Sequence, residues 1–138
     1  MIRIKLLILG LCLCVSAMVF ASNQHVHPEA NDNGLTTPAN NSKWAGYCEI
    51  EIINNSYEDL RVYGIFDDGL PMDPFNIYSF ESAHYISLYY YGYCHPGMDL
   101  YIDTWSGYHV YAGYTPRRRT IRVVPYLTNQ VKADVSVN

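Results

Sequence analysis

Tyrosine is the side chain in this sequence with the most binding chemistry to offer. The chain has 14 tyrosines, and 13 of them lie between Tyr47 and Tyr114. Each pairs a rigid ring with a hydroxyl, which suits stacking against a sugar ring or anchoring a protein partner. Tyr85, Tyr89 and Tyr91 have the same parity along one segment, so they are predicted to share a face. The structural alternative is that these tyrosines only stabilise strands through cross-strand aromatic pairs.

A second group combines a ring with two carboxylates. Asp99, Tyr101 and Asp103 alternate with apolar residues between 98 and 104, so they are expected to face outward together. Carboxylates beside a ring can accept hydrogen bonds from sugar hydroxyls. The two aspartates lie roughly 13 Å apart along an extended strand, whereas paired glycosidase carboxylates are roughly 5 to 9.5 Å apart. The group therefore predicts ligand binding and not glycoside cleavage.

A cluster of basic residues forms the third group. It consists of Arg117, Arg118, Arg119 and Arg122, which follow Pro116 and lead into a predicted strand. Guanidinium forks bind phosphate, sulfate or carboxylate in a bidentate manner, which indicates an anionic lipid head group, glycan or acidic protein as the ligand. The alternative is that charge at a strand end prevents edge-to-edge pairing.

Motifs for catalysis and metal binding are absent from the sequence. It contains no GxSxG, HExxH, P-loop or dinucleotide-binding glycine pattern. Asp67, Asp68 and Asp73 lack the ligand spacing of a calcium hand, and hairpin chemistry explains the first two. His25 and His27 suit only weak copper or zinc binding. We therefore predict no catalytic residue, no metal site and no cofactor.

The charge balance excludes general nucleic-acid binding. The chain carries 9 Lys and Arg against 13 Asp and Glu, a formal net charge of −4. Binding to a phosphate backbone requires a basic footprint, which this composition does not provide.

The first 21 residues have the three parts of a secretory signal: two early basic residues, an almost wholly apolar run over 4–20, and the small residue Ala21 at the cleavage position. An uncleaved membrane anchor and a lipoprotein are the alternatives. Cleavage leaves no stable membrane span and predicts a secreted or periplasmic protein. Cys48 and Cys94 are then the only cysteines, and an oxidising compartment predicts a disulfide between them.

The remaining pattern predicts an all-β fold. Residues 22–43 are poor in large apolar side chains and are expected to form a flexible tail, and 44–138 are expected to form an antiparallel β-sandwich of about eight short strands. These strands are expected at 48–54, 60–66, 75–80, 84–91, 98–104, 108–114, 120–124 and 131–137, with a loop bracketed by Pro71 and Pro74. The shape is immunoglobulin-like only in general terms, and a jelly roll or small barrel is the alternative.

These observations predict a secreted, non-enzymatic binding module. Its expected partner is a glycan or protein surface, including an anionic one, recognised through the tyrosine-rich strands and the arginine cluster. In a bacterium such a protein would be an exported effector, an adhesin-like module or an inhibitor. A small secreted hydrolase with a site assembled across strands and a structural envelope protein are the alternatives.

Overall fold

The protein is a β-sandwich in its computed structural model, which describes residues 23–31, 46–127 and 130–138. The strands are β1 (Gln24–His25), β2 (Glu49–Asn54), β3 (Leu60–Phe66), β4 (Pro71–Ile77), β5 (His84–Ser87), β6 (Tyr89–Tyr90), β7 (Tyr93–Cys94), β8 (Gly97–Thr104), β9 (His109–Pro116), β10 (Arg119–Leu127) and β11 (Gln130–Val137). The only helical element in these ranges is the 3-10 turn η1 (Pro28–Asn31). The predicted all-β sandwich is confirmed.

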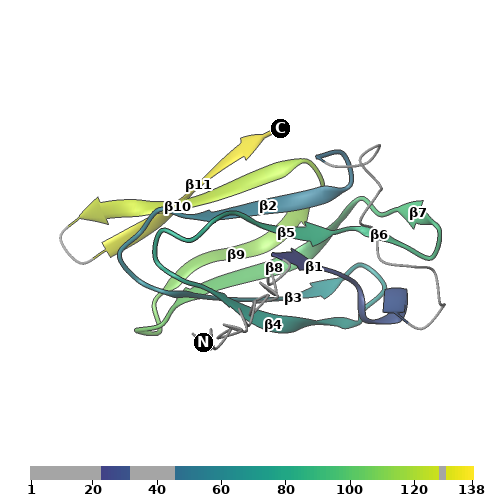
Figure 1. The fold of residues 1–138 in the computed structure, drawn as a ribbon, viewed down its shortest axis with the longest axis horizontal. Coiled ribbons are helices and arrows are strands. Elements are labelled where there is room, and N and C mark those ends of the chain that lie inside the picture. The colour runs from purple at the N-terminus through teal and green to yellow at the C-terminus, as the bar shows by residue number, and fades with distance from the viewer. Residues whose placement is uncertain (1–22, 32–45, 128–129) are drawn as a thin grey trace, which may run out of the picture.

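Two open sheets form the layers of the sandwich (Figure 1). Sheet A has the order β1-β5-β2-β10-β11, and sheet B has the order β4-β3-β8-β9. Each sheet ends in two edge strands and does not close on itself, which excludes the small-barrel alternative. Sheet B is wholly antiparallel, whereas sheet A contains two parallel pairings, β2 with β10 and β1 with β5, that the sequence pattern did not predict.

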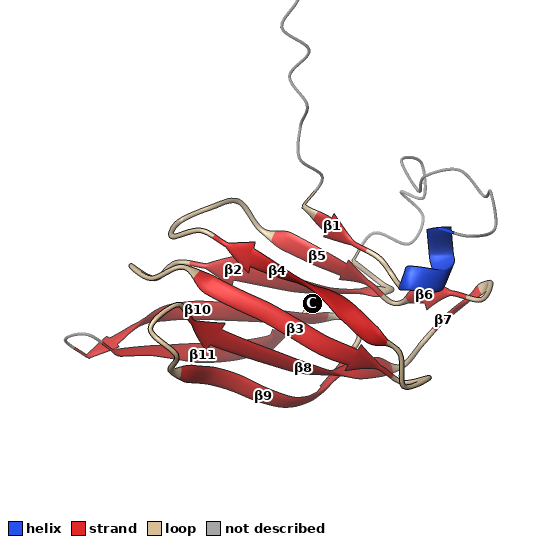
Figure 2. Ribbon diagram, turned by 90° about the horizontal axis from the view of Figure 1, so that it is seen from below, coloured by secondary structure: helices blue, strands red, loops and turns tan. Residues whose placement is uncertain are grey.

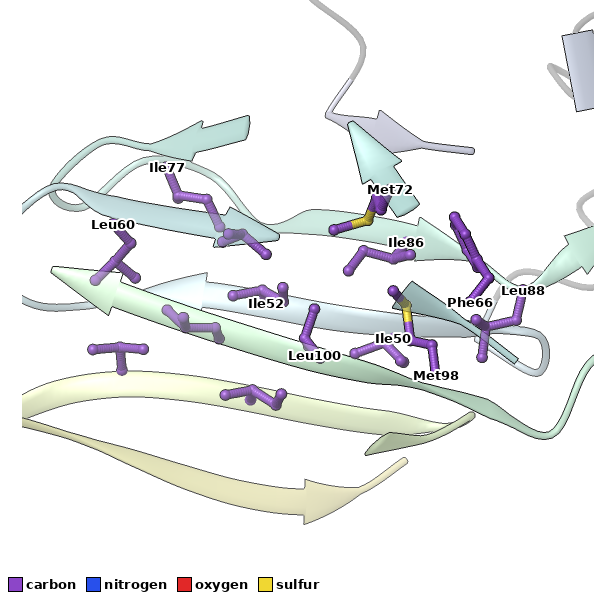
Figure 3. Close-up of a cluster of buried hydrophobic side chains, with 14 of the residues drawn as sticks. Ile50, Ile52, Leu60, Phe66, Met72, Ile77, Ile86, Leu88, Met98 and Leu100 are labelled. Atoms are coloured by element: carbon purple, nitrogen blue, oxygen red, sulfur yellow. The ribbon is translucent and has the colours of Figure 1, made fainter. Parts of the chain in front are cut away.

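The core lies between the two sheets and follows from strict alternation along the strands. Ile50 and Ile52 of β2 and Leu100 and Ile102 of β8 are fully buried, and Figure 3 shows such side chains pointing into the space between the layers. Burying one aliphatic side chain of this size stabilises the fold by roughly 1.5–3 kcal/mol. The residues between them in sequence must therefore point outward, which fixes what each sheet offers to solvent.

Strand β4 corrects one part of the predicted strand pattern. Pro71 and Pro74 belong to this strand, where a loop was expected. The strand was expected over 75–80 but ends at Ile77, so residues 78–80 lie outside it. Proline cannot donate to a ladder, so it is normally confined to edge strands. Strand β4 is an edge of sheet B and pairs only with β3, so its unpaired side tolerates both prolines.

The predicted strand over 84–91 is also interrupted. It leaves sheet A after Ser87, and β6 pairs instead with β7 in a small hairpin. The predicted disulfide between Cys48 and Cys94 is confirmed, and it links the start of β2 to this hairpin. The Leu88 N–H donates to the Cys48 carbonyl at 2.8 Å, so the backbone supports the same connection.

Residues 23–31 are packed on the sandwich, which corrects the predicted tail over this range. Strand β1 adds to the edge of sheet A beside β5, and the His27 side chain just after it has no exposed surface. Figure 2 shows η1 beside β6 at one end of the sandwich. The prediction counted only large apolar residues, whereas histidine rings make the contacts of this segment.

The predicted signal peptide over 1–21, together with residues 32–43 of the predicted tail, lies outside the described residues. Within the described ranges, no helix has the length and apolar character needed to cross a membrane.

Candidate functional site

The outer face of sheet B gathers the predicted carboxylate group with further aromatic residues. Three cross-strand rows run across β3, β8 and β9, and we call these nine residues the tyrosine face: Arg61, Asp103 and His109; Tyr63, Tyr101 and Ala112; Ile65, Asp99 and Tyr114. Their neighbours in sequence face the core, so the tyrosine face is the solvent side of the sheet. Asp99, Tyr101 and Asp103 thus share one face, and their role in binding stays a prediction.

A stacked pair of rings occupies the middle row. The ring centroids of Tyr63 and Tyr101 are 5.3 Å apart with an angle of 15° between the planes. Such offset stacking stabilises cross-strand neighbours. On the other side of Tyr101 lies Ala112, whose methyl group is too small to cover an aromatic ring.

Asp103 is held in place by two neighbours on the tyrosine face. The Tyr63 hydroxyl donates to Asp103 Oδ2 at 3.0 Å, and His109 Nδ1 donates to Asp103 Oδ1 at 2.6 Å. The hydrogen bond to Asp103 raises the pKa of Tyr63, which keeps its phenol protonated and in position as a donor. The carboxylate that a ligand would meet is therefore oriented before binding.

An open hollow of about 270 Å³ adjoins the tyrosine face, lined by Arg61, Asp103, Thr104, Trp105 and Gly107. Trp105 is 74 % exposed, and its backbone N–H donates to the Asp59 carbonyl at 2.9 Å. Gly107 has a φ of 89° in the β8–β9 turn, a conformation that favours glycine. Sequence reasoning missed Trp105 because a turn residue carries no strand periodicity. Arg61 and Tyr63 did alternate outward, but nothing local placed them beside β8.

The tyrosines at 85, 89 and 91 do not form one face, which corrects that prediction. Tyr85 lies on the outer side of sheet A, where its hydroxyl donates to Glu51 at 3.2 Å. Tyr89 belongs to the small hairpin, and Tyr91 follows it with a φ of 52° and donates to Asp68 at 3.0 Å. The reason is the chain's departure from sheet A after Ser87, which breaks the alternation on which the prediction depended.

The arginines divide into two groups. The guanidinium carbons of Arg117 and Arg118 lie 4.7 and 5.7 Å from the centroid of the Tyr47 ring. Arg119 shares its side of β10 with the buried residue Ile121, whereas Arg122 points the other way and is exposed. No ion pair joins any of these four side chains to an Asp or Glu of the described ranges. Only the first two therefore form a common basic surface.

A stack of four rings, which we call the ring stack, closes one end of the sandwich. It contains His27, Tyr90, His95 and Tyr93, with successive centroids 4.0, 3.6 and 4.0 Å apart. It contacts the β3–β4 turn, where His95 Nδ1 donates to Asp67 at 2.9 Å and His27 Nε2 donates to Asp68 at 3.0 Å.

The turn carboxylates are tuned by these contacts. Burial alone would raise the pKa of Asp67, but hydrogen bonds from Tyr90 and His95 outweigh it and lower that pKa. Burial, together with the bond to Asp67, raises the pKa of Tyr90. His95 Nε2 is buried and has no hydrogen-bond partner among the described residues. Sequence reasoning explained Asp67 and Asp68 by turn chemistry alone, because their partners are distant in sequence.

His109 and Asp103 form part of the arrangement that a hydrolase would need. His109 has Asp103 as an orienting acid and is well exposed, which is half of a catalytic arrangement. No hydroxyl or thiol of the described residues hydrogen-bonds to its imidazole, and the Ser106 hydroxyl contacts Glu58 and Thr104 instead. The same ranges contain no group of three or more His, Cys, Asp or Glu side chains arranged to hold a metal.

Comparison of the chain with protein-family models, with characterised proteins and with solved structures finds no match in any of the three.

Proposed function

We propose that this protein is a secreted, non-enzymatic module that binds a glycan through the tyrosine face. The observation that carries the proposal is the stacked pair of Tyr63 and Tyr101 beside the pre-oriented carboxylate of Asp103, next to the open hollow at Trp105. The disulfide between Cys48 and Cys94 supports an oxidising compartment, secreted or periplasmic.

A sugar needs two kinds of contact that this face combines. The C–H groups of a pyranose ring pack on an aromatic surface, and its hydroxyls require acceptors and donors at defined positions. The tyrosine face offers Tyr101 and the half-exposed Tyr114 for the first requirement. Asp99 and Asp103 provide acceptors for the second. All of these side chains stand on rigid strands, which lowers the entropic cost of binding.

The test is a glycan array followed by titration calorimetry of each positive glycan. Replacing Tyr101 with Ala should weaken binding by at least about tenfold, because truncation of an aromatic anchor commonly costs more than about 1–2 kcal/mol. Tyr126→Ala is the matched control, since Tyr126 is 59 % exposed and lies on β10 outside the face. Circular dichroism would check that both variants fold. If no glycan binds, or if Tyr101→Ala and Tyr126→Ala bind alike, the proposal is wrong.

A protein partner is the second candidate. The Tyr47, Arg117 and Arg118 surface favours it, since arginine and tyrosine are enriched where protein interfaces concentrate their binding energy. If a protein partner binds this surface, a pull-down with the Arg117→Ala variant should recover less of that partner than the wild type does, whereas Tyr101→Ala on the tyrosine face should recover as much.

A further inference from the structure

Arg61 differs from the other charged groups of its row because its charge is not neutralised. Arg61 is an exposed residue of β3 on the tyrosine face. Its direct cross-strand neighbour on β8 is Asp103. Yet no carboxylate of the described ranges lies within ion-pairing distance of its guanidinium. Asp103 instead accepts one hydrogen bond at each oxygen, from the Tyr63 hydroxyl and from the His109 imidazole, and each oxygen keeps a further acceptor site.

The surroundings of Arg61 form a site of limited size. Its guanidinium carbon is 5.9 Å from the Tyr63 ring centroid, and its side chain lines the hollow together with Trp105. Ligand pockets usually measure roughly 300–1,000 Å³, so a hollow of about 270 Å³ suits a single sugar residue. Thr104 and Asp103 line the same hollow.

We infer that this hollow binds a sugar residue that carries a carboxylate, with the carboxylate on Arg61 and the sugar ring against Trp105. The inference rests on the proposed glycan-binding function and names the class of sugar. A guanidinium fork matches the two oxygens of a carboxylate, and such bidentate bonds are roughly twice as strong as neutral ones. The exposed indole supplies the apolar surface for the ring.

The local charges restrict the ligand further. Asp99 and Asp103 lie on the same face, and Glu58 accepts a hydrogen bond from Ser106 in the adjoining turn. A chain with a negative charge on every sugar would be repelled by these carboxylates. A single acidic residue within an otherwise neutral oligosaccharide places its charge only at Arg61. The site therefore selects a neutral glycan with one acidic sugar.

The experiment compares oligosaccharides that end in a uronic or sialic acid with their carboxyl-reduced forms, by titration calorimetry on the purified protein. Each acid should bind at least tenfold more tightly than its reduced form. Arg61→Ala should abolish this preference, so that the acidic form and its reduced form bind with equal affinity. Arg61→Lys keeps the charge without the fork and should recover only part of the preference. Arg122→Ala is the matched control and should behave as wild type.

The outcomes separate this inference from the proposed function. Equal binding of acidic and reduced forms by the wild type, or an unchanged preference in Arg61→Ala, would overturn the acidic-sugar assignment and leave glycan binding standing. Tighter binding of sulfated analogues than of carboxylates would also overturn it. Loss of binding to every oligosaccharide in the Tyr101→Ala variant, with the acid preference of the wild type intact, supports both statements. Failure of the wild type to bind any of them removes both.

Discussion

The imidazole of His27 is held at both ring nitrogens. The Glu29 backbone N–H donates to Nδ1 at 3.2 Å, so this nitrogen carries no proton, and Nε2 donates to Asp68. The ring also stacks on Tyr90 and meets Phe66 edge-on. Hydrogen bonds at both nitrogens therefore fix the orientation of a ring that is completely buried.

Replacing His27 with Ala should lower the free energy of unfolding by about 2 kcal/mol, because it removes a buried ring and leaves Asp68 without its imidazole donor. Urea denaturation at neutral pH measures the loss. Glu29→Ala is the control, since that side chain is exposed and only its backbone N–H contacts His27. If His27→Ala is as stable as the wild type, residues 23–31 do not pack as described.

The hydroxyl of Tyr63 holds the Asp103 carboxylate in position. Tyr63→Phe keeps the stack on Tyr101 but removes the donor to Asp103, so the carboxylate loses part of its orientation. Stability should fall by less than about 1 kcal/mol because the bond is solvent-accessible, whereas glycan affinity should fall severalfold.

The matched control for that change is Tyr111→Phe, which removes a hydroxyl bonded to Thr115 on the other side of β9. Titration calorimetry with any glycan found on the array compares the two variants. A larger loss of affinity in Tyr111→Phe would show that the tyrosine face is not the binding surface.

The element formed by 23–31 is attached through titratable groups. His25 Nε2 lies 2.9 Å from His84 Nδ1, and the His25 ring stacks on Phe75 with centroids 3.3 Å apart. His84 faces Glu81 at 3.6 Å on its other nitrogen. Burial, and then the neighbouring His84, lower the pKa of His25 to about 4 from its ordinary value of 6.5.

The direction of the pH effect follows from this pKa. The folded state binds fewer protons at His25 than the unfolded state, so this contribution to stability is complete above pH 6.5 and is lost as the pH falls from 6.5 to about 4. We expect a loss of about 1 kcal/mol, since the site is only half-buried and solvent screens part of the effect. Urea denaturation at pH 7.5 and 4.5 measures it.

His25→Phe keeps a ring against Phe75 and cannot gain a proton, so its stability should change less over this range than that of the wild type. Asp67 and Asp68 contribute little to this difference, because their ordinary pKa of 3.8 and their lowered pKa in the folded state both lie below pH 4.5. An equal pH dependence in wild type and His25→Phe would assign the effect to other groups.

The disulfide is the other device that holds elements together. It closes a loop with a sequence separation of 46 residues, for which chain entropy gives about 4 kcal/mol of stabilisation. The Cys48→Ser, Cys94→Ser double variant should therefore unfold at a much lower urea concentration than the wild type. Dithiothreitol should bring the wild type to the same midpoint, and a midpoint that stays unchanged in both cases would contradict the prediction.

Strands with strict alternation could be predicted from the sequence nearly to their ends. The segments 60–66 and 98–104 correspond to β3 and β8 because apolar residues recur at alternate positions in them and are buried between the sheets. Strand β4 could not, since proline is compatible with a strand only at an edge, and edge position is a property of the whole sheet. The same limit applies to the site. Asp99, Tyr101 and Asp103 were visible in one strand, but pairing with Arg61 and Tyr63 depends on the register between β3 and β8.

At the scale of the whole molecule, the basic surface at Tyr47 and the hollow lie at opposite ends of the same strands. Arg117 follows β9 at the end where Gly97 pairs with Pro116, whereas the hollow lies at the end where Asp103 pairs with His109. Six residues of β8 separate these two rows, which corresponds to roughly 20 Å. At physiological salt the Debye length is about 8 Å, so each end acts on a ligand through its local charge despite the net charge of −4.

This separation predicts how the protein behaves on a sulfated resin. Arg117→Ala and Lys132→Ala lower the net charge equally, but Lys132 is already paired with Asp134 at 3.0 Å, whereas Arg117 contacts only the Tyr47 ring among the charged and aromatic groups described. Arg117→Ala should therefore elute from immobilised heparin at a clearly lower salt concentration than Lys132→Ala. Equal shifts in the two variants would mean that net charge governs retention, and the basic surface at Tyr47 would then have no binding role of its own.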